Sequence, residues 1–110
     1  MKRKMRYIRT KETDCRIIDT IKYKEITGED CFIPKNEIVD EADTIEELCD
    51  EFVVVYENGA IVYDDLEWAK VKAKASSKIG IKLIIYGAIW TDKGLIYVAK
   101  INDKGELELL

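Results

Sequence analysis

Three short turn sequences constrain how this chain folds, because each lies between two runs of apolar residues. Asn58-Gly59 separates the β-branched and aromatic run Phe52–Tyr56 from a second run, Ala60–Tyr63. The Asn-Gly pair readily adopts the two positive backbone angles of a tight hairpin turn. The sequence therefore predicts an antiparallel β-hairpin at this place.

The C-terminal part also has turn sequences between apolar runs, which predicts a β-meander. "TDKG" occupies residues 91–94 and "NDKG" residues 102–105, and each predicts a type I turn closed by a left-handed glycine. We expect strands at Ile81–Trp90, at Leu95–Ile101 and in the final "ELELL". Ile81–Trp90 is apolar on both faces, which predicts a central strand covered on both sides. The last strand is a candidate sheet edge, through which a second copy of the chain could pair.

The N-terminal half carries shorter extended segments. Met5–Thr10 predicts a first strand. Cys15–Tyr23 largely alternates between apolar and polar residues, although Asp19 breaks the pattern, and this alternation predicts a second strand. "CFIP" and "KNEIV", residues 31–39, predict two short extended pieces divided by Pro34.

A first short helix is predicted just before the hairpin. Ile45, Leu48, Cys49 and Phe52 repeat at the spacing i, i+3, i+4 and i+7, which places them on one helical stripe. Thr44 begins a capping box that Glu47, three residues later, completes. Such a helix has only about two turns, so packing must stabilise it.

A second helix is predicted after the hairpin, with Asp64 as its cap. Residues 66–76 also fit a strand, because alanine and lysine alternate there. The alanines favour the helix. The fold class that follows is α+β: a mostly antiparallel, strongly curved sheet or small partly open barrel with two short helices. The length predicts a single domain over residues 1–110.

The residue types exclude several chemistries. The chain has no histidine, which removes the usual general base near neutral pH. No glycine-rich phosphate loop is present. Cys15, Cys31 and Cys49 are widely spaced, which is typical of reduced thiols and not of a zinc site. We expect no enzyme activity and no catalytic, cofactor-binding or metal-binding residue.

The hydropathy pattern gives an expectation about location. The basic start of the chain is not followed by an apolar stretch, so no secretory signal is predicted. The longest nearly uncharged run, "LIIYGAIWT", is too short to cross a bilayer. We therefore expect a cytoplasmic protein that does not associate with membranes.

Charge is concentrated in the middle of the chain. Residues 36–69 hold twelve acidic side chains and no basic one, while the regions on both sides carry a net positive charge. Around the first predicted helix the acids are Asp40, Glu41, Asp43, Glu46, Glu47, Asp50 and Glu51. The plainest interpretation is a solvated helix face. The functional hypothesis is a docking surface for a partner protein with a basic surface, because such a field steers association.

Two further hypotheses involve nucleic acid. The acidic surface could mimic nucleic acid and block a host DNA-binding protein. Alternatively, the basic N-terminus could bind nucleic acid directly, with Tyr86 and Trp90 stacking on bases if they are exposed. The sequence pI of about 5.0 opposes direct binding, and both aromatic residues are expected in the core. Carboxylate-bound calcium or magnesium is also disfavoured, because no Asp-x-Asp-x-Asp-Gly loop is present.

Three stretches resemble a group of small uncharacterised proteins from phages, prophages and mobile elements of Gram-positive bacteria. They are "MRYIRT", "ADTIEELCDEFVVVYENG" and "YGAIWTDKGLIYVAKINDKGELELL". The resemblance implies a phage or mobile-element accessory protein that works in a bacterial cytoplasm. It implies no activity, substrate or catalytic residue.

Overall fold

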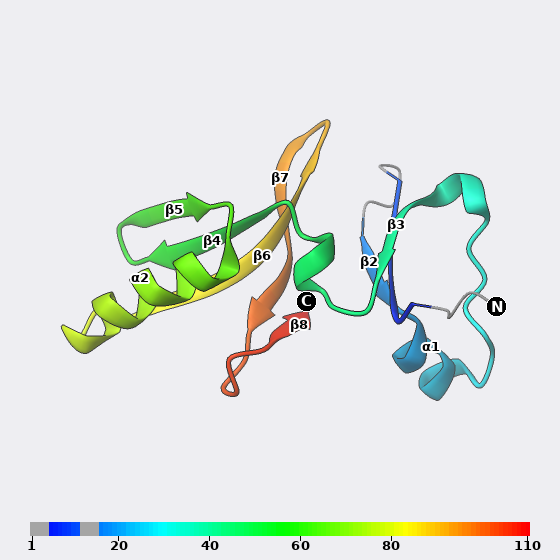
Figure 1. Cartoon of the computed structure of the whole chain (residues 1–110), viewed down its shortest axis with the longest axis horizontal. Coiled ribbons are helices and arrows are strands. Elements are labelled where there is room, and N and C mark those ends of the chain that lie inside the picture. Colours follow the sequence, from blue (N-terminus) through cyan, green and yellow to red (C-terminus); the bar gives the residue numbers. More distant parts are fainter. Residues whose placement is uncertain (1–4, 12–15) are drawn as a thin grey trace. The chain divides into compact units, whose positions relative to one another are not determined.

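The computed structural model describes residues 5–11 and 16–110. The chain divides into two compact units, Met1–Leu48 and Cys49–Leu110. Within the described residues it is an α+β protein, with two α-helices and two antiparallel sheets (Figure 1). The predicted class is confirmed, but the predicted strong curvature or barrel is wrong, because both sheets are open. The expectation of a single domain over 1–110 stays a prediction.

The first unit contains a three-stranded sheet. Its strands are β1 (Tyr7–Thr10), β2 (Ile17–Asp19) and β3 (Ile38–Ala42), in the order β2-β1-β3. Both pairs are antiparallel, and Ile8 of β1 lies opposite Ile18 and Glu41. The first predicted strand is thus confirmed.

Of the second predicted strand only β2 is confirmed, because helix α1 (Thr20–Thr27) follows it directly, and Cys15 lies outside the described residues. Asp19 is the N-cap, and its Oδ1 accepts the backbone N–H groups of Ile21 and Lys22 at 3.1 and 3.2 Å. Gly28, with φ of 76°, ends the helix in the left-handed conformation. The residue that interrupted the alternation was therefore a helix-start signal.

The expectation for residues 31–39 is also wrong in part. Cys31–Pro34 forms no strand, and a single 3-10 turn, η1 (Lys35–Glu37), follows it. The Glu37 N–H donates to the Pro34 carbonyl at 2.8 Å, which closes that turn. The extended backbone begins only at Ile38, where β3 pairs with β1.

The predicted acidic α-helix is wrong, since the chain forms only one 3-10 turn there, η2 (Glu46–Leu48). The Glu47 N–H does reach the Thr44 hydroxyl oxygen, at 3.4 Å, and Leu48 is buried. However, β4 (Glu51–Tyr56) begins three residues later and pairs with a neighbouring strand from Glu51 onward. Phe52 therefore joins the sheet and not a helix, because a two-turn helix has little stability of its own.

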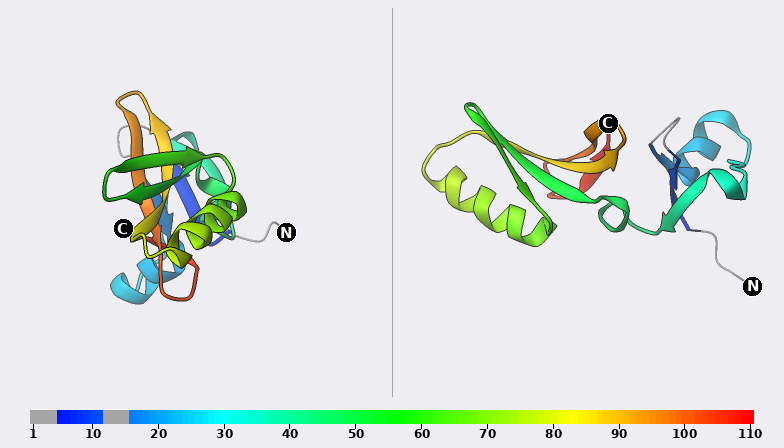
Figure 2. Two further views of the ribbon diagram at one scale, coloured as in Figure 1. Left: turned by 90° about the vertical axis from the view of Figure 1, so that its left-hand side faces the viewer. Right: turned by 90° about the horizontal axis from the view of Figure 1, so that it is seen from above.

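The second unit contains a five-stranded antiparallel sheet. Its order is β5-β4-β6-β7-β8, with β5 (Gly59–Tyr63), β6 (Leu83–Thr91), β7 (Gly94–Ile101) and β8 (Leu107–Leu109) around β4. The hairpin, the meander and the central place of β6 are confirmed (Figure 2). The hairpin turn itself consists of Glu57 and Asn58, and Gly59 already belongs to β5. Strand β8 is an edge, as expected.

Helix α2 (Leu66–Lys78) resolves the helix-or-strand ambiguity. Leu66, Ala69 and Ala73 are buried, and their spacing is helical, not alternating. The N-cap is Asp65, whose Oδ1 accepts the N–H of Glu67 at 3.2 Å, and not the neighbouring Asp64.

The core of the second unit lies between α2 and the sheet. The buried side chains of α2 pack there against Phe52, Val54 and Ile85. On β6, Gly87 permits close packing, because a Cβ atom at this position would lie 2.7 Å from the Cys49 Sγ. An alanine here would therefore require the Cys49 side chain or the strand to shift.

The opposite face of this sheet is partly open. By strand alternation and register, Val62, Ile84, Trp90 and Tyr97 share that face, and they are 43–55% exposed. The prediction that Trp90 lies in the core is wrong, since it is 55% exposed. Tyr86 stacks on Tyr97, with ring centroids 4.6 Å apart.

Candidate interaction surface

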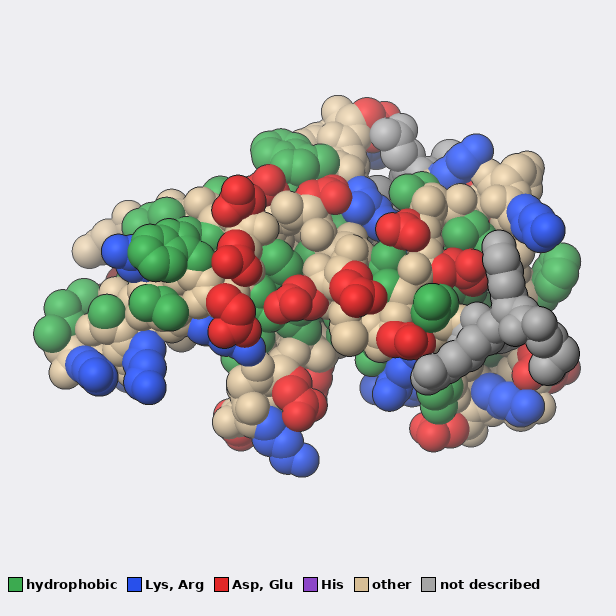
Figure 3. Space-filling view, viewed as in Figure 1, with side chains coloured by type: hydrophobic (Ala, Val, Ile, Leu, Met, Phe, Trp, Pro, Cys, Tyr) green, Lys and Arg blue, Asp and Glu red, His purple; other side chains and the backbone are tan. Residues whose placement is uncertain are grey.

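The predicted acidic residues lie on several short elements. In the first unit, Asp40 and Glu41 belong to β3, Asp43 follows this strand, and Glu46 and Glu47 belong to η2. All five side chains are exposed. Figure 3 shows acidic side chains on the surface in one view of the molecule. The acids thus reach solvent without the helix that was expected to present them.

Four of these carboxylates form no ion pair with a lysine or arginine of the described residues. Other charged residues there are paired, for example Arg6 with Asp19, Lys24 with Asp30 and Lys70 with Glu67. The four carboxylates without an ion pair, called here the acidic docking segment, are those of Asp40, Glu41, Glu46 and Glu47. Their charge is therefore compensated mainly by solvent and salt.

One cation does lie near this segment. Arg9 faces Asp40 across the β1–β3 pair. Its Nη1, however, donates a hydrogen bond of 3.2 Å to the main-chain carbonyl of Leu48. Asp40 instead accepts the N–H of the next residue, Glu41, through Oδ1 at 2.8 Å. The arginine thus tethers the η2 turn to β1.

Asp50 and Glu51 belong to the second unit, and Asp50 has a structural contact that the sequence analysis missed. Its Oδ2 accepts the backbone N–H of Trp90 at 2.8 Å, and its own N–H donates to the Ala88 carbonyl at 2.9 Å. Together these bonds continue the hydrogen bonding with β6 to Asp50, the residue just before β4. No local signal could have revealed this role, because the hydrogen-bonded residues lie 40 positions apart.

We therefore expect Asp50→Ala to destabilise the second unit by about 1 kcal/mol, because the Trp90 N–H loses a charged acceptor. Glu47→Ala, a change at an exposed acid of the docking segment, should alter the unfolding free energy by less than about 0.5 kcal/mol. Chemical denaturation of both variants measures the difference. Equal, negligible effects would contradict the structural role of Asp50.

Arg6 and Asp19 form a bidentate charged pair in the first unit. Arg6 Nε lies 3.1 Å from Asp19 Oδ1, and Nη2 lies 2.9 Å from Oδ2. Burial raises the pKa of Asp19, but the hydrogen bonds from Arg6 and from the backbone of α1 outweigh it and lower that pKa. The hydrogen bond to Asp19 correspondingly raises the pKa of Arg6. The Arg6 guanidinium therefore serves a structural ion pair with Asp19.

The structural role of Arg6 weakens the hypothesis of nucleic-acid binding through the basic N-terminus. Arg6 and Arg9 of that basic stretch both make contacts within the first unit. Lys2, Arg3 and Lys4 lie outside the described residues. Two tryptophans do reach solvent in the second unit: Trp90, and Trp68, whose ring lies 4.9 Å from the Lys72 Nζ. They supply exposed aromatic rings in the second unit.

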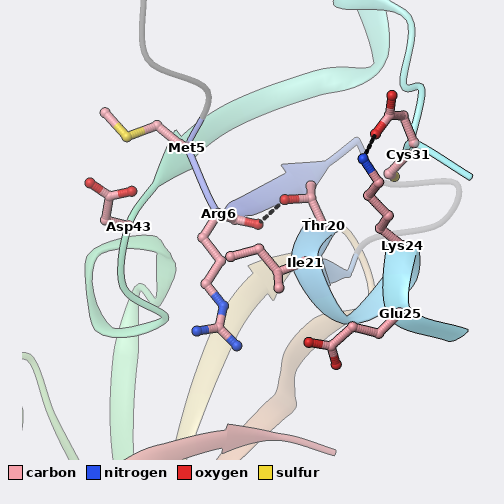
Figure 4. Close-up of a pocket in the computed structure, with 9 residues that line it drawn as sticks. Met5, Arg6, Thr20, Ile21, Lys24, Glu25, Cys31 and Asp43 are labelled. Carbon is pink, nitrogen blue, oxygen red and sulfur yellow. Dashed lines mark hydrogen bonds and ion pairs between the residues drawn. The ribbon is translucent and has the colours of Figure 1, made fainter. Parts of the chain in front are cut away.

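A pocket of about 430 Å³ lies in the first unit between β1, α1 and the following loop (Figure 4). Its walls are mainly apolar, with Met5, Ile21 and the buried Cys31 among the lining residues. The Thr20 hydroxyl donates to the Arg6 carbonyl at 2.7 Å, and Lys24 pairs with Asp30 at 3.2 Å. Four lining residues of the pocket are thus joined in two polar contacts, Thr20 with Arg6 and Lys24 with Asp30.

The thiols and carboxylates assemble no metal centre in the described residues. No group of three or more cysteine, aspartate or glutamate side chains there is arranged to hold a metal ion. Cys31 is buried and Cys49 is partly buried. Cys15 lies outside the described residues, so the expected redox state of the three thiols stays a prediction.

Comparison with known proteins adds no relative. No protein-family model, no curated protein and no solved structure matches this chain. Among residues 5–11 and 16–110, no helix is both long enough and apolar enough to span a membrane.

Proposed function

We propose that this chain is a non-catalytic interaction module whose acidic docking segment binds a partner protein with a basic surface. One observation supports the proposal. Asp40, Glu41, Glu46 and Glu47 are exposed, and no lysine or arginine of the described residues pairs with them. A solvated surface that only served folding would need no such excess of one sign.

Electrostatics gives this segment a definite role in association. Exposed charges of one sign steer an oppositely charged partner toward the binding site and raise the association rate more than the final affinity. Screening by salt weakens this attraction over about 8–10 Å at physiological ionic strength. Partner binding should therefore be fast at low salt and should slow as salt is added.

The resemblance to phage and mobile-element proteins suggests where such a partner is found. It would place the module in a bacterial cytoplasm, as an accessory protein acting on a host or phage protein. Mimicry of nucleic acid is the special case in which the basic partner is a DNA-binding protein.

The test neutralises the docking segment. The variant carries Asp40→Asn, Glu41→Gln, Glu46→Gln and Glu47→Gln. Its unfolding free energy should stay within about 0.5 kcal/mol of the parent, because like charges are removed from an exposed surface. Capture of partner proteins from a bacterial lysate, identified by mass spectrometry, should be lost.

A matched control removes four exposed acids elsewhere. It carries Glu29→Gln, Asp92→Asn, Asp103→Asn and Glu106→Gln and so has the same net charge as the test variant. This control should keep the partner. Equal loss of partner capture in both variants would show that the effect depends only on net charge. Destabilisation of the test variant by several kcal/mol would show that these acids have a structural role. Either result contradicts the proposal.

A further inference from the structure

Within residues 5–11 and 16–110 the two sheets have four edge strands, and only β5 among them lacks the usual protection against pairing. Strands β2 and β8 have three residues each. Strand β3 carries Asp40 and Glu41, and its register with β1 is irregular. Strand β5 has five residues, contains no charged residue or proline, and pairs regularly with β4. Short length, charge and irregular register are the devices that keep edges unpaired, so β5 is the open edge.

The backbone of β5 presents hydrogen-bonding groups outward. Tyr56 and Gly59 are partners across the two-residue turn, so they form the hydrogen-bonded pair next to it. Antiparallel alternation then directs the N–H and C=O groups of Ala60 and Val62 away from β4. In the described part of the chain β4 is the only strand that pairs with β5.

The side chains of β5 are equally open. Ile61 and Val62 are each 49% exposed and point to opposite faces of the sheet. Ile61 shares the face on which α2 packs, since it lies opposite Val54 of the core. A strand added beyond β5 would therefore cover apolar surface on both faces at once.

The ends of this edge carry negative charge. Glu57 lies in the turn before β5, Asp64 follows the strand directly, and both are exposed. No lysine or arginine occurs in residues 36–69. These charges select against a second copy of the chain. Antiparallel pairing of two β5 strands about Ile61 would bring Glu57 of one copy beside Asp65 of the other, and like charges placed so destabilise a strand pair.

We propose that the open edge of β5 binds an extended peptide segment of a partner protein by strand addition. The segment has alternating β-branched residues at its centre and lysine or arginine at its ends. Main-chain hydrogen bonds to Ala60 and Val62 hold it, and its basic ends meet Glu57 and Asp64. This site lies in the second unit and shares no residue with the acidic docking segment, so it does not depend on the proposed function.

The probe is a fluorescein-labelled peptide, KKTVTVTKK, titrated with the full chain at low salt and followed by fluorescence anisotropy. We expect saturable binding, and no binding of the charge-reversed peptide EETVTVTEE. The double variant Glu57→Gln, Asp64→Asn should bind the basic peptide about threefold to tenfold more weakly, because two exposed charge pairs are lost. Asp65 is left unchanged, since it caps α2.

Two further measurements test the main-chain contacts. Val62→Pro should abolish binding, because proline removes an outward N–H without removing a bond to β4. Two N-methylated peptides, each blocked on one of the two alternating sets of amides, should differ, with only one losing affinity. The peptide pair keeps the test decisive even if the proline variant unfolds.

Several outcomes would overturn the inference. They are absence of binding, equal affinity of both N-methylated peptides, and loss of binding in the variant that neutralises the acidic docking segment. If the chain dimerises and Val62→Pro abolishes this dimerisation, the edge of β5 binds a second copy and not a peptide. Peptide binding that survives loss of lysate capture would support this inference while the proposed function fails.

Discussion

Replacing Phe52 by alanine is expected to lower the free energy of unfolding of the second unit by about 3–5 kcal/mol. Phe52 is 4% exposed and packs in the core between β4 and α2, together with Leu66 and Ala69. Its removal leaves a cavity, because the strand ladders on both sides of β4 hold the backbone in place. A loss of this size is a large fraction of the stability of a small unit.

The measurement uses urea denaturation followed by tryptophan fluorescence. Trp68 and Trp90 both belong to the second unit and therefore report its unfolding. The matched control is Phe32→Ala, at the only other phenylalanine of the chain, which is 84% exposed. That control should change the stability by less than about 0.5 kcal/mol. A cost below about 1 kcal/mol for Phe52→Ala would contradict the described core.

Replacing Asp19 by alanine is expected to lower the stability of the first unit by about 2 kcal/mol at neutral pH. One side chain is lost from two interactions: the N-cap of α1 and the bidentate pair with Arg6. Asp19→Asn is the control, because asparagine caps helices well but carries no charge. We expect Asn to recover roughly half of the loss.

The charge of Asp19 also makes this contribution depend on pH. Its pKa is lowered in the folded protein, so the folded state favours the ionised form. The stabilisation is therefore fully present above the unfolded-state pKa of about 4, and it is lost as the pH falls through the folded-state value. The difference between the parent and Asp19→Asn, measured by far-UV circular dichroism, should shrink on acidification from about pH 6 to about pH 3. A difference that stays constant would contradict the ion pair.

Local patterns were sufficient to predict most of the second unit. Three of its strand pairs, β4–β5, β6–β7 and β7–β8, are joined by short turns, and these turns carry local signals, such as the glycine of "NDKG" with φ of 78° at Gly105. Consecutive antiparallel strands need no long-range information, because the turn sets both the partner and the register. The same holds for α2, whose alanines and capping acid act within a few residues.

Two local patterns, one at residues 45–52 and one around Asp19, misled the prediction. The apolar stripe at residues 45–52 fits a helix, yet Phe52 belongs to β4, where β6 lies alongside it. At Asp19, a single polar residue interrupts an alternating run that predicts a strand, and this residue is the N-cap of α1. In both places a short helix and a strand compete, and contacts with distant residues decide between them.

The acidic residues of the candidate site were predicted, but the elements that carry them were not. The excess of carboxylates between residues 36 and 69 is a property of the sequence, and five of the seven predicted acids are exposed. The role of Asp50 and the open edge of β5 could not be predicted. The first depends on the main chain of Trp90, and the second on which strand lies last in the sheet.

Sequence alone dictates the charge pattern, the absence of histidine and the hairpins, because these depend on residue identity and on neighbours a few positions apart. Tertiary structure decides which acids reach solvent without an ion pair, which strand ends the sheet, and whether residues 45–52 coil or extend. The physical reason is that burial and strand pairing join residues distant in the chain, and their free energy outweighs the small preferences of a short segment.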